Sequence, residues 1–138
     1  MVSAQRDTET LGGQVLCFVM AETREALANI DAIASTPGLD GIYIGPADLA
    51  LGLGLPPDLD KTEPEHVAAV ERIRDACLNN RIVPGIQCAS GAFGRAYAER
   101  GFRFITIAKD SALLQAGVRK EMQVALGKAG EAARLGYT

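Results

Sequence analysis

The sequence has no tryptophan, a single histidine and only three cysteines, and these shortages exclude several classes of protein. Cys17, Cys77 and Cys88 are widely spaced and form no C-x-x-C pair, so they fit neither a disulfide framework nor a zinc site. We therefore expect reduced thiols in a cytoplasmic protein. Aromatic residues make up only 5% of the chain, whereas glycine occurs 15 times, which suits an α/β fold with many tight turns.

Long apolar runs and an excess of positive charge are also missing. No run of about 18 apolar residues occurs, so we expect no transmembrane helix. Residues 1–10 lack the apolar centre of a secretory signal. The 14 basic and 17 acidic residues give a net charge of −3, which argues against a nucleic-acid partner. With 138 residues, 48% of them hydrophobic, the chain predicts a single packed domain over residues 1–138.

Four apolar segments predict β-strands. The first, residues 14–21, is a continuous apolar run after a glycine pair, which is typical of a strand buried on both faces. The others span residues 39–45, 81–87 and 102–108. Pro84 lies in the third segment, where proline is tolerated at a strand end or a bulge.

Helical patterns follow each predicted strand. Thr23 suits an N-cap, and the helices are expected between Thr23 and Pro37 and over residues 46–53, 64–79, 90–100 and 111–126. In the helix 64–79, the residues at helical spacing are Val67, Val70, Ile73, Ala76 and Cys77. In the last helix, with Asp110 as its cap, the residues expected to face inward are Leu113, Leu114, Val118, Met122 and Leu126. The tail to residue 138 predicts a frayed end or a short arm.

Repeated βα units predict an α/β fold with a parallel sheet and right-handed crossovers. Two architectures satisfy this pattern: an open four-stranded sheet, and half of an eight-stranded (β/α)₈ barrel, which takes about 250 residues when complete. Periodicity does not distinguish between the two.

Two carboxylates stand at the predicted ends of neighbouring strands. Glu22 follows the first strand and Asp48 follows the second, one βα unit later. Active sites of parallel α/β folds lie at this edge of the sheet. Two such carboxylates can share a Mg²⁺ or Mn²⁺ ion, since hard cations take oxygen ligands. The alternative is that both are polar caps at helix starts, favoured by the helix dipole.

The tetrapeptide Gly45-Pro46-Ala47-Asp48 begins the short second helix. Free backbone N–H groups at a helix start can bind an anion, so a small carboxylate can lie at Ala47 and Asp48 while Asp48 reaches a metal ion. A plain tight turn explains the same residues equally well.

Four further side chains are candidates for a reactive or ligand-binding role, each with a structural alternative. Lys109 ends the fourth strand and is either a Schiff-base lysine or a solvated charge beside Asp110. Cys88 is either a nucleophile or a small buried side chain, and the second reading is favoured because no histidine lies near it in sequence. Ser90 stands at a helix start that can hold a phosphate. His66 is expected on the surface of its helix.

Two stretches of the chain resemble one known family. AETREALANIDAIASTPGLDGIYIGPADLALGLG and ERGFRFITIAKD are similar to the HpcH/HpaI aldolases, which include 4-hydroxy-2-oxoheptanedioate aldolases. The joint pattern of E-T-R-E-A-L followed by G-x-D-G-x-x-I-G-P-A-D-L is far longer than a single short motif, and the resemblance runs from about residue 14 to residue 127. It implies a (β/α)₈ barrel enzyme that depends on a divalent metal and that makes or cleaves a carbon–carbon bond next to pyruvate.

The resemblance also implies roles for particular residues. Glu22 and Asp48 match the family's metal ligands, for Mg²⁺, Mn²⁺ or Co²⁺. The backbone of Gly45, Ala47 and Asp48 matches the part that holds the pyruvate carboxylate. The metal polarises the keto oxygen and stabilises the enolate.

The sequence departs from the family in two respects. Met20 stands where the family has a glutamine two residues before the metal-binding glutamate, so a polar contact to the substrate is lost. The chain also matches only the C-terminal half of the barrel, without the first four βα units. The family's catalytic histidine and arginine belong to that missing half, so no catalytic residue is assigned.

These observations lead to two alternative functions. The first is a class II pyruvate aldolase whose site is completed by a partner, as a homo-oligomer between a dimer and a hexamer, because a half barrel has two open sheet edges. The second is a non-catalytic, truncated remnant that folds, binds a cation or a small carboxylate and oligomerises. A citrate-lyase-type chemistry is less favoured, since no basic patch for coenzyme A is evident. No nucleic acid or membrane partner is expected.

Overall fold

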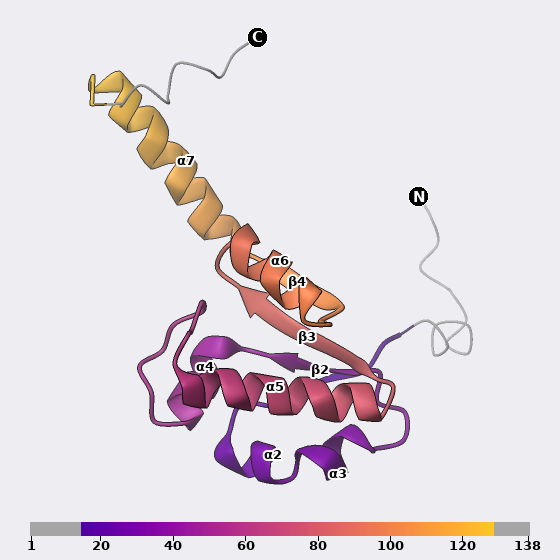
Figure 1. The fold of residues 1–138 in the computed structure, drawn as a ribbon. Helices are drawn as coiled ribbons and strands as arrows, with labels where there is room; N and C mark the ends of the chain where they lie inside the picture. Colours follow the sequence, from indigo (N-terminus) through magenta and orange to yellow (C-terminus); the bar gives the residue numbers. More distant parts are fainter. Residues whose placement is uncertain (1–14, 129–138) are drawn as a thin grey trace, which may run out of the picture.

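The computed structural model describes residues 15–128, whose four strands form one sheet in the order β1-β2-β3-β4 (Figure 1). All three pairs of neighbouring strands are parallel, which confirms the predicted βα repeat. The elements in chain order are β1 (Phe18–Met20), α2 (Arg24–Ala28), α3 (Ile30–Ala34), β2 (Gly41–Ile44), α4 (Pro46–Gly52), α5 (Pro64–Asn79), β3 (Val83–Cys88), α6 (Gly91–Glu99), β4 (Phe104–Ile107) and α7 (Asp110–Ala125).

One face of the sheet carries the hydrophobic core. Ile44 pairs with Ile86 across β2 and β3, and both side chains are fully buried on this face. The long helix α5 packs along the same two strands and buries Val70 and Ile73 against them. This helix begins at Pro64 and ends at Asn79, as the sequence predicted.

The opposite face carries aromatic side chains and no described helix. Phe18, Tyr43 and Phe104 come from three different strands and contact one another, with ring centroids 5.2 Å apart for Phe18–Phe104 and 5.6 Å for Tyr43–Phe104. Tyr43 Oη hydrogen-bonds Thr106 Oγ1 at 2.5 Å, passing over β3 at Gly85. Phe104 is still 44% exposed, because among residues 15–128 nothing covers this face.

The first strand is shorter and less buried than the sequence predicted. The prediction of a strand over 14–21, buried on both faces, is wrong for the described part: β1 has three residues, and Val15 and Leu16 before it are exposed. Position 14 lies outside the described residues. The reason is topological: β1 is an edge strand with β2 as its one neighbour, and only one of its faces meets helices.

The helix expected after β1 is divided into α2 and α3. Thr23 caps α2 as predicted, since its Oγ1 accepts a hydrogen bond from the Ala26 N–H at 3.0 Å. Asn29 separates the two helices, and its side-chain amide donates to the Glu25 carbonyl at 2.9 Å. An asparagine side chain that competes for backbone groups in this way favours a break.

The last helix, α7, extends away from the sheet (Figure 1). Its expected inward face is wrong: none of its residues is buried, and Leu114 is 70% exposed. The apolar spacing is present, but no other described element lies against it. Lys109 is the N-cap residue, and Asp110 is the first residue of the helix instead of its cap. The expected frayed tail falls on residues beyond 128, outside the described part.

Candidate metal and substrate site

Glu22 and Asp48 meet at the carboxyl edge of the sheet. Glu22 lies two residues beyond the end of β1, and Asp48 lies in the first turn of α4, which follows β2 directly. A Cβ atom placed on Gly45 would overlap Glu22 Oε1 and would lie 3.2 Å from Asp48 Oδ2. The two carboxylate oxygens are therefore within about 5.5 Å of each other, where two charges interact directly.

The environment of Glu22 is unfavourable for a bare negative charge. Its Oε1 atom is buried and has no hydrogen-bond partner among the described residues. Burial raises the pKa of Glu22 above its ordinary value, the negative charge of Asp48 raises it further, and a backbone hydrogen bond at Gly45 partly opposes both effects. A buried acceptor without a donor is uncommon in folded proteins. A cation between Glu22 and Asp48 would satisfy the buried oxygen and remove the repulsion.

The residues present thus fit a divalent cation as a partial ligand set. Carboxylate oxygens suit Mg²⁺ and Mn²⁺, which keep several water molecules or substrate oxygens in their remaining positions. Within residues 15–128, no group of three or more His, Cys, Asp or Glu side chains has a metal-binding arrangement. Protein ligands from this part of the chain would therefore number two.

Two glycines allow α4 to lie against the segment that carries Glu22. Gly45, the N-cap of α4, has φ −91° and ψ 101°, so its backbone does not require glycine. A Cβ there would displace the Glu22 carboxylate from its present position. Gly52, at the end of α4, has no space for a Cβ because the Glu22 backbone carbonyl occupies it. The two glycines lie seven residues apart, on one side of the helix.

Met20 and the tetrapeptide of α4 lie at the same edge of the sheet. Met20 ends β1, pairs with Tyr43 and is 56% exposed, on the sheet face that carries the aromatic cluster. Pro46 is buried at the first position of α4, Ala47 is half-buried and Asp48 is exposed. The structure therefore brings the predicted substrate and metal residues to one region.

The other candidate side chains differ in their surroundings. Cys88 is fully buried, as the second interpretation predicted, and burial raises the pKa of its thiol to about 11, which disfavours the thiolate that a nucleophile needs. Ser90 caps α6 by accepting from the Phe93 N–H, and its hydroxyl donates to Asp60 at 2.9 Å. Lys109 is exposed at the start of α7.

Asp60 is a residue that sequence reasoning missed. Its carboxylate accepts hydrogen bonds from the Ala89 N–H and from the Ser90 hydroxyl, both at 2.9 Å. Asp60 therefore connects the loop after α4 to the turn after β3 by two hydrogen bonds. No short-range signal identifies this contact, since the partners are about thirty residues apart.

The prediction that His66 lies on the surface is wrong. Its side chain is fully buried, and its Nε2 atom lies 3.0 Å from the Pro46 carbonyl oxygen. The physical reason is helical spacing: His66, Val70, Ile73 and Cys77 follow each other at intervals of four, three and four residues on the buried side of α5. The predicted apolar stripe began one residue too late, at Val67.

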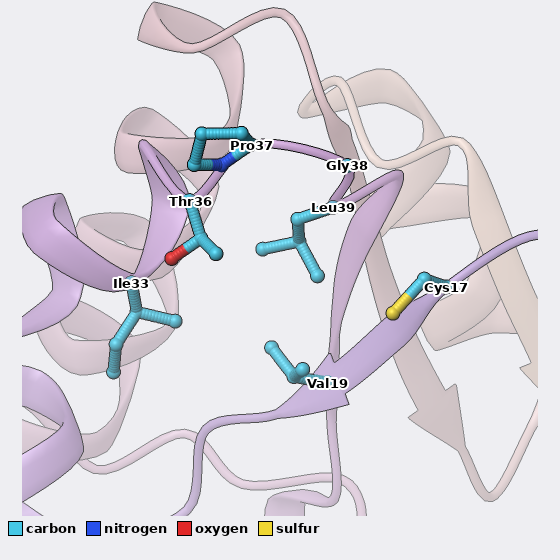
Figure 2. A pocket seen from close by; sticks show the side chains of 7 residues that line it. All are labelled: Cys17, Val19, Ile33, Thr36, Pro37, Gly38 and Leu39. Carbon is cyan, nitrogen blue, oxygen red and sulfur yellow. The ribbon is translucent and has the colours of Figure 1, made fainter.

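A small cavity lies at the opposite edge of the sheet (Figure 2). It has a volume of about 140 Å³ and is mainly apolar. Its lining residues come from the amino ends of β1 and β2 and from the end of α3: Cys17, Val19, Ile33, Thr36, Pro37, Gly38 and Leu39. Because Glu22 and Asp48 lie beyond the carboxyl ends of these strands, the cavity is separate from their site.

None of the described helices is long and apolar enough to cross a membrane.

Comparisons with known proteins identify a family. The family described as HpcH/HpaI aldolase/citrate lyase matches residues 2–116. A hydroxypyruvate/pyruvate aldolase of Rhizorhabdus wittichii is 47% identical over 106 residues, which are 77% of this chain and 42% of that protein. A 4-hydroxy-2-oxo-heptane-1,7-dioate aldolase of Salmonella arizonae is 36% identical over 103 residues, or 72% of this chain and 37% of that protein.

Solved structures show the same relationship. A HpcH/HpaI aldolase/citrate lyase family protein from Burkholderia cenocepacia superposes with a TM-score of 0.78 and 32% identity, over 85% of this chain and 45% of that one. The chain spans about two fifths of the curated relatives it matches, and its four βα units correspond to about half of the family's barrel fold. By sequence and by fold, the chain belongs to the HpcH/HpaI aldolase/citrate lyase family.

Proposed function

We propose that the chain provides the cation-binding and 2-oxo-acid-binding half of a divalent-metal-dependent aldolase that cleaves or forms 4-hydroxy-2-oxo acids. One observation carries the proposal: the buried Glu22 Oε1 atom has no donor among residues 15–128 and lies near a second carboxylate, Asp48. Neither helix capping nor a plain turn accounts for such a pair. Membership of an aldolase and lyase family supports the same conclusion.

In this proposal each residue of the site has one role. Glu22 and Asp48 hold Mg²⁺, Mn²⁺ or Co²⁺, and the backbone of Gly45, Ala47 and Asp48 holds the carboxylate of a small 2-oxo acid such as pyruvate. Met20 lines the site without a polar contact to substrate. The bound cation supplies Lewis acidity toward the keto oxygen.

Proton transfer in this proposal depends on another polypeptide. Cys88 is unsuitable because its thiol is buried and its pKa is raised to about 11. Ser90 is already engaged by Asp60. Loss of a general acid–base group slows an enzyme by typically 10²–10⁴-fold. We therefore expect weak activity from the chain alone and higher activity once a partner completes the site.

We propose a homo-oligomer, from dimer to hexamer, as the state in which the site is completed. The aromatic sheet face and the apolar side of α7 are exposed among the described residues, and both edges of the sheet are open. Residues 1–138 would then act as one domain that corresponds to the C-terminal half of the barrel. We expect the assembly in the cytoplasm, without nucleic acid.

The test is pyruvate release from 4-hydroxy-2-oxoheptanedioate by the purified chain with Mg²⁺ or Mn²⁺ and then with EDTA. A second assay runs the reaction in the synthetic direction and compares pyruvate with hydroxypyruvate as the donor substrate. The expected result is slow, EDTA-sensitive turnover that Glu22→Gln abolishes and Glu121→Gln, an exposed change on α7, leaves intact. Turnover that survives both EDTA and Glu22→Gln would contradict the assignment of the site.

A second candidate is a non-catalytic protein that binds a cation or a small carboxylate and oligomerises. The observation that favours it is the limited ligand set: the described residues contain two carboxylates at the site and no histidine that reaches it. Cation binding without turnover in every oligomeric fraction would support this candidate over the enzyme.

A further inference from the structure

His66 is a fully buried polar side chain that connects two helices. It belongs to the first turn of α5, and its Nε2 atom lies 3.0 Å from the carbonyl oxygen of Pro46, the first residue of α4. A carbonyl oxygen can only accept, so Nε2 must carry the hydrogen and donate it. The Nδ1 atom is buried without a hydrogen-bond partner among the described residues.

The two helices differ greatly in how well they are supported. α5 has 16 residues and packs against β2, β3 and α3. α4 has seven residues, a length at which a helix is marginal without tertiary support. At its N-terminal end it is held by the buried side chain of Pro46 and the hydrogen bond from His66, and further along by the buried Leu49 and Ala50 and by the close packing of Gly52 on the Glu22 backbone. His66 therefore connects the stable helix to the short one at the turn that carries Asp48.

We propose that His66 is a positioning residue: its hydrogen bond to Pro46 fixes the first turn of α4 and thereby holds the Asp48 carboxylate beside Glu22. His66 touches neither of the two carboxylates and would not contact the cation. The effect on cation binding rests on the proposed function, whereas the effect on α4 does not.

The charge state of the ring suits this role. Burial lowers the pKa of His66, and the positive charge of Lys61 lowers it further, while the hydrogen bond to Pro46 and the negative charge of Glu63 act in the opposite direction. Lys61 is itself buried and forms an ion pair with Glu63. At neutral pH the ring is therefore an uncharged donor, which an uncharged amide can replace.

Two variants separate the hydrogen bond from the volume of the side chain. His66→Leu fills the space and removes the donor, whereas His66→Gln keeps an N–H near the position of Nε2. Ile73→Val is the matched control. It shortens a fully buried side chain of the same helix, and this side chain makes no hydrogen bond to α4. This control shows how a general loss of stability, about 0.5–1.5 kcal/mol for this substitution, affects Mn²⁺ binding and hydrogen exchange.

The experiment measures Mn²⁺ affinity by calorimetry and backbone hydrogen exchange by mass spectrometry on the full chain and its variants. We expect His66→Leu to weaken Mn²⁺ binding by on the order of tenfold, as for other residues that orient metal ligands. We also expect it to speed exchange in α4 more than in α6. His66→Gln should restore both values to near those of the unmodified chain, and Ile73→Val should change neither selectively.

The outcomes distinguish this inference from the proposed function. Unchanged Mn²⁺ affinity and unchanged α4 exchange in a folded His66→Leu variant would overturn the positioning role while leaving the cation site intact. Absence of Mn²⁺ binding by the unmodified chain would instead contradict the proposed function. In that case the exchange measurement still decides whether His66 fixes α4.

Discussion

Replacing Glu22 with glutamine should stabilise the metal-free protein while removing its response to metal. The substitution keeps the shape of the side chain, but it removes the charge that lies near Asp48. It also supplies an amide N–H₂ group that can donate to the neighbouring carboxylate. Most substitutions of partly buried groups destabilise a protein, so a gain would be specific to this like-charge pair.

The expected gain follows from the separation of the carboxylates. At the upper limit of about 5.5 Å, two unit charges repel by about 0.8 kcal/mol in water and by about 3 kcal/mol at an effective dielectric constant of 20. Asp48 is exposed, so the value lies toward the lower limit, at about 1 kcal/mol. For a chain of this size, that corresponds to a rise in Tm of about 3–5 °C.

Metal should reverse the order of stability. The unmodified chain at a Mn²⁺ concentration one hundred times its Kd would gain about 2.7 kcal/mol, whereas the Glu22→Gln variant would gain little. Thermal unfolding by calorimetry, with EDTA and with Mn²⁺, measures both effects, and Glu121→Gln on α7 is the control for an isolated loss of negative charge. A metal-free Glu22→Gln variant that melts below the unmodified chain, or one that keeps the full Mn²⁺ response, would refute the reasoning.

Three further outcomes follow from packing and burial. Gly52→Ala should cost at least about 2 kcal/mol of unfolding free energy, because the new Cβ meets a backbone carbonyl. Gly91→Ala, which has open space around it, should change the unfolding free energy by less than about 1 kcal/mol. Urea unfolding compares the two variants, and equal midpoints would contradict the close packing of α4. Ile73→Ala, in the core, should lower the unfolding free energy by about 2–5 kcal/mol. Val118→Ala, half-exposed on α7, should lower it by less than about 0.5 kcal/mol in a monomeric sample. A large loss of stability in the Val118→Ala variant would show that α7 is covered in solution. A chromogenic disulfide reagent should titrate one fast thiol, Cys17, since burial raises the pKa of the other two to about 11; three fast thiols in the native chain would contradict the buried positions.

Start and stop signals of helices were predictable because they act over a few residues. Pro64 and Asn79 bound α5 as expected, and Thr23 caps α2 through its own side chain. The parallel order of the strands was predictable too, since a helix between consecutive strands returns the chain to the same edge of the sheet. The same rule predicted that residues after β1 and β2, among them Glu22 and Asp48, would be neighbours.

Burial was not predictable from local pattern. The apolar patterns at β1 and α7 predict buried side chains. Leu16 and Leu114 are nevertheless exposed, because no other described segment packs against them. His66 reads as a polar surface residue, yet it is buried because its position on α5 coincides with the side that meets α4. In each case the surroundings of a side chain depend on segments far away in the sequence.

The residue types of the candidate site, its place after two neighbouring strands and its family resemblance were all readable from the chain. Only the tertiary structure decided that Glu22 Oε1 is buried without a donor from the described part of the chain, that Gly52 leaves no space for a Cβ, and that His66 of α5 lies against the Pro46 carbonyl. The reason is that hydrogen-bond satisfaction and close packing are properties of atoms brought together by folding, and no sequence interval specifies them.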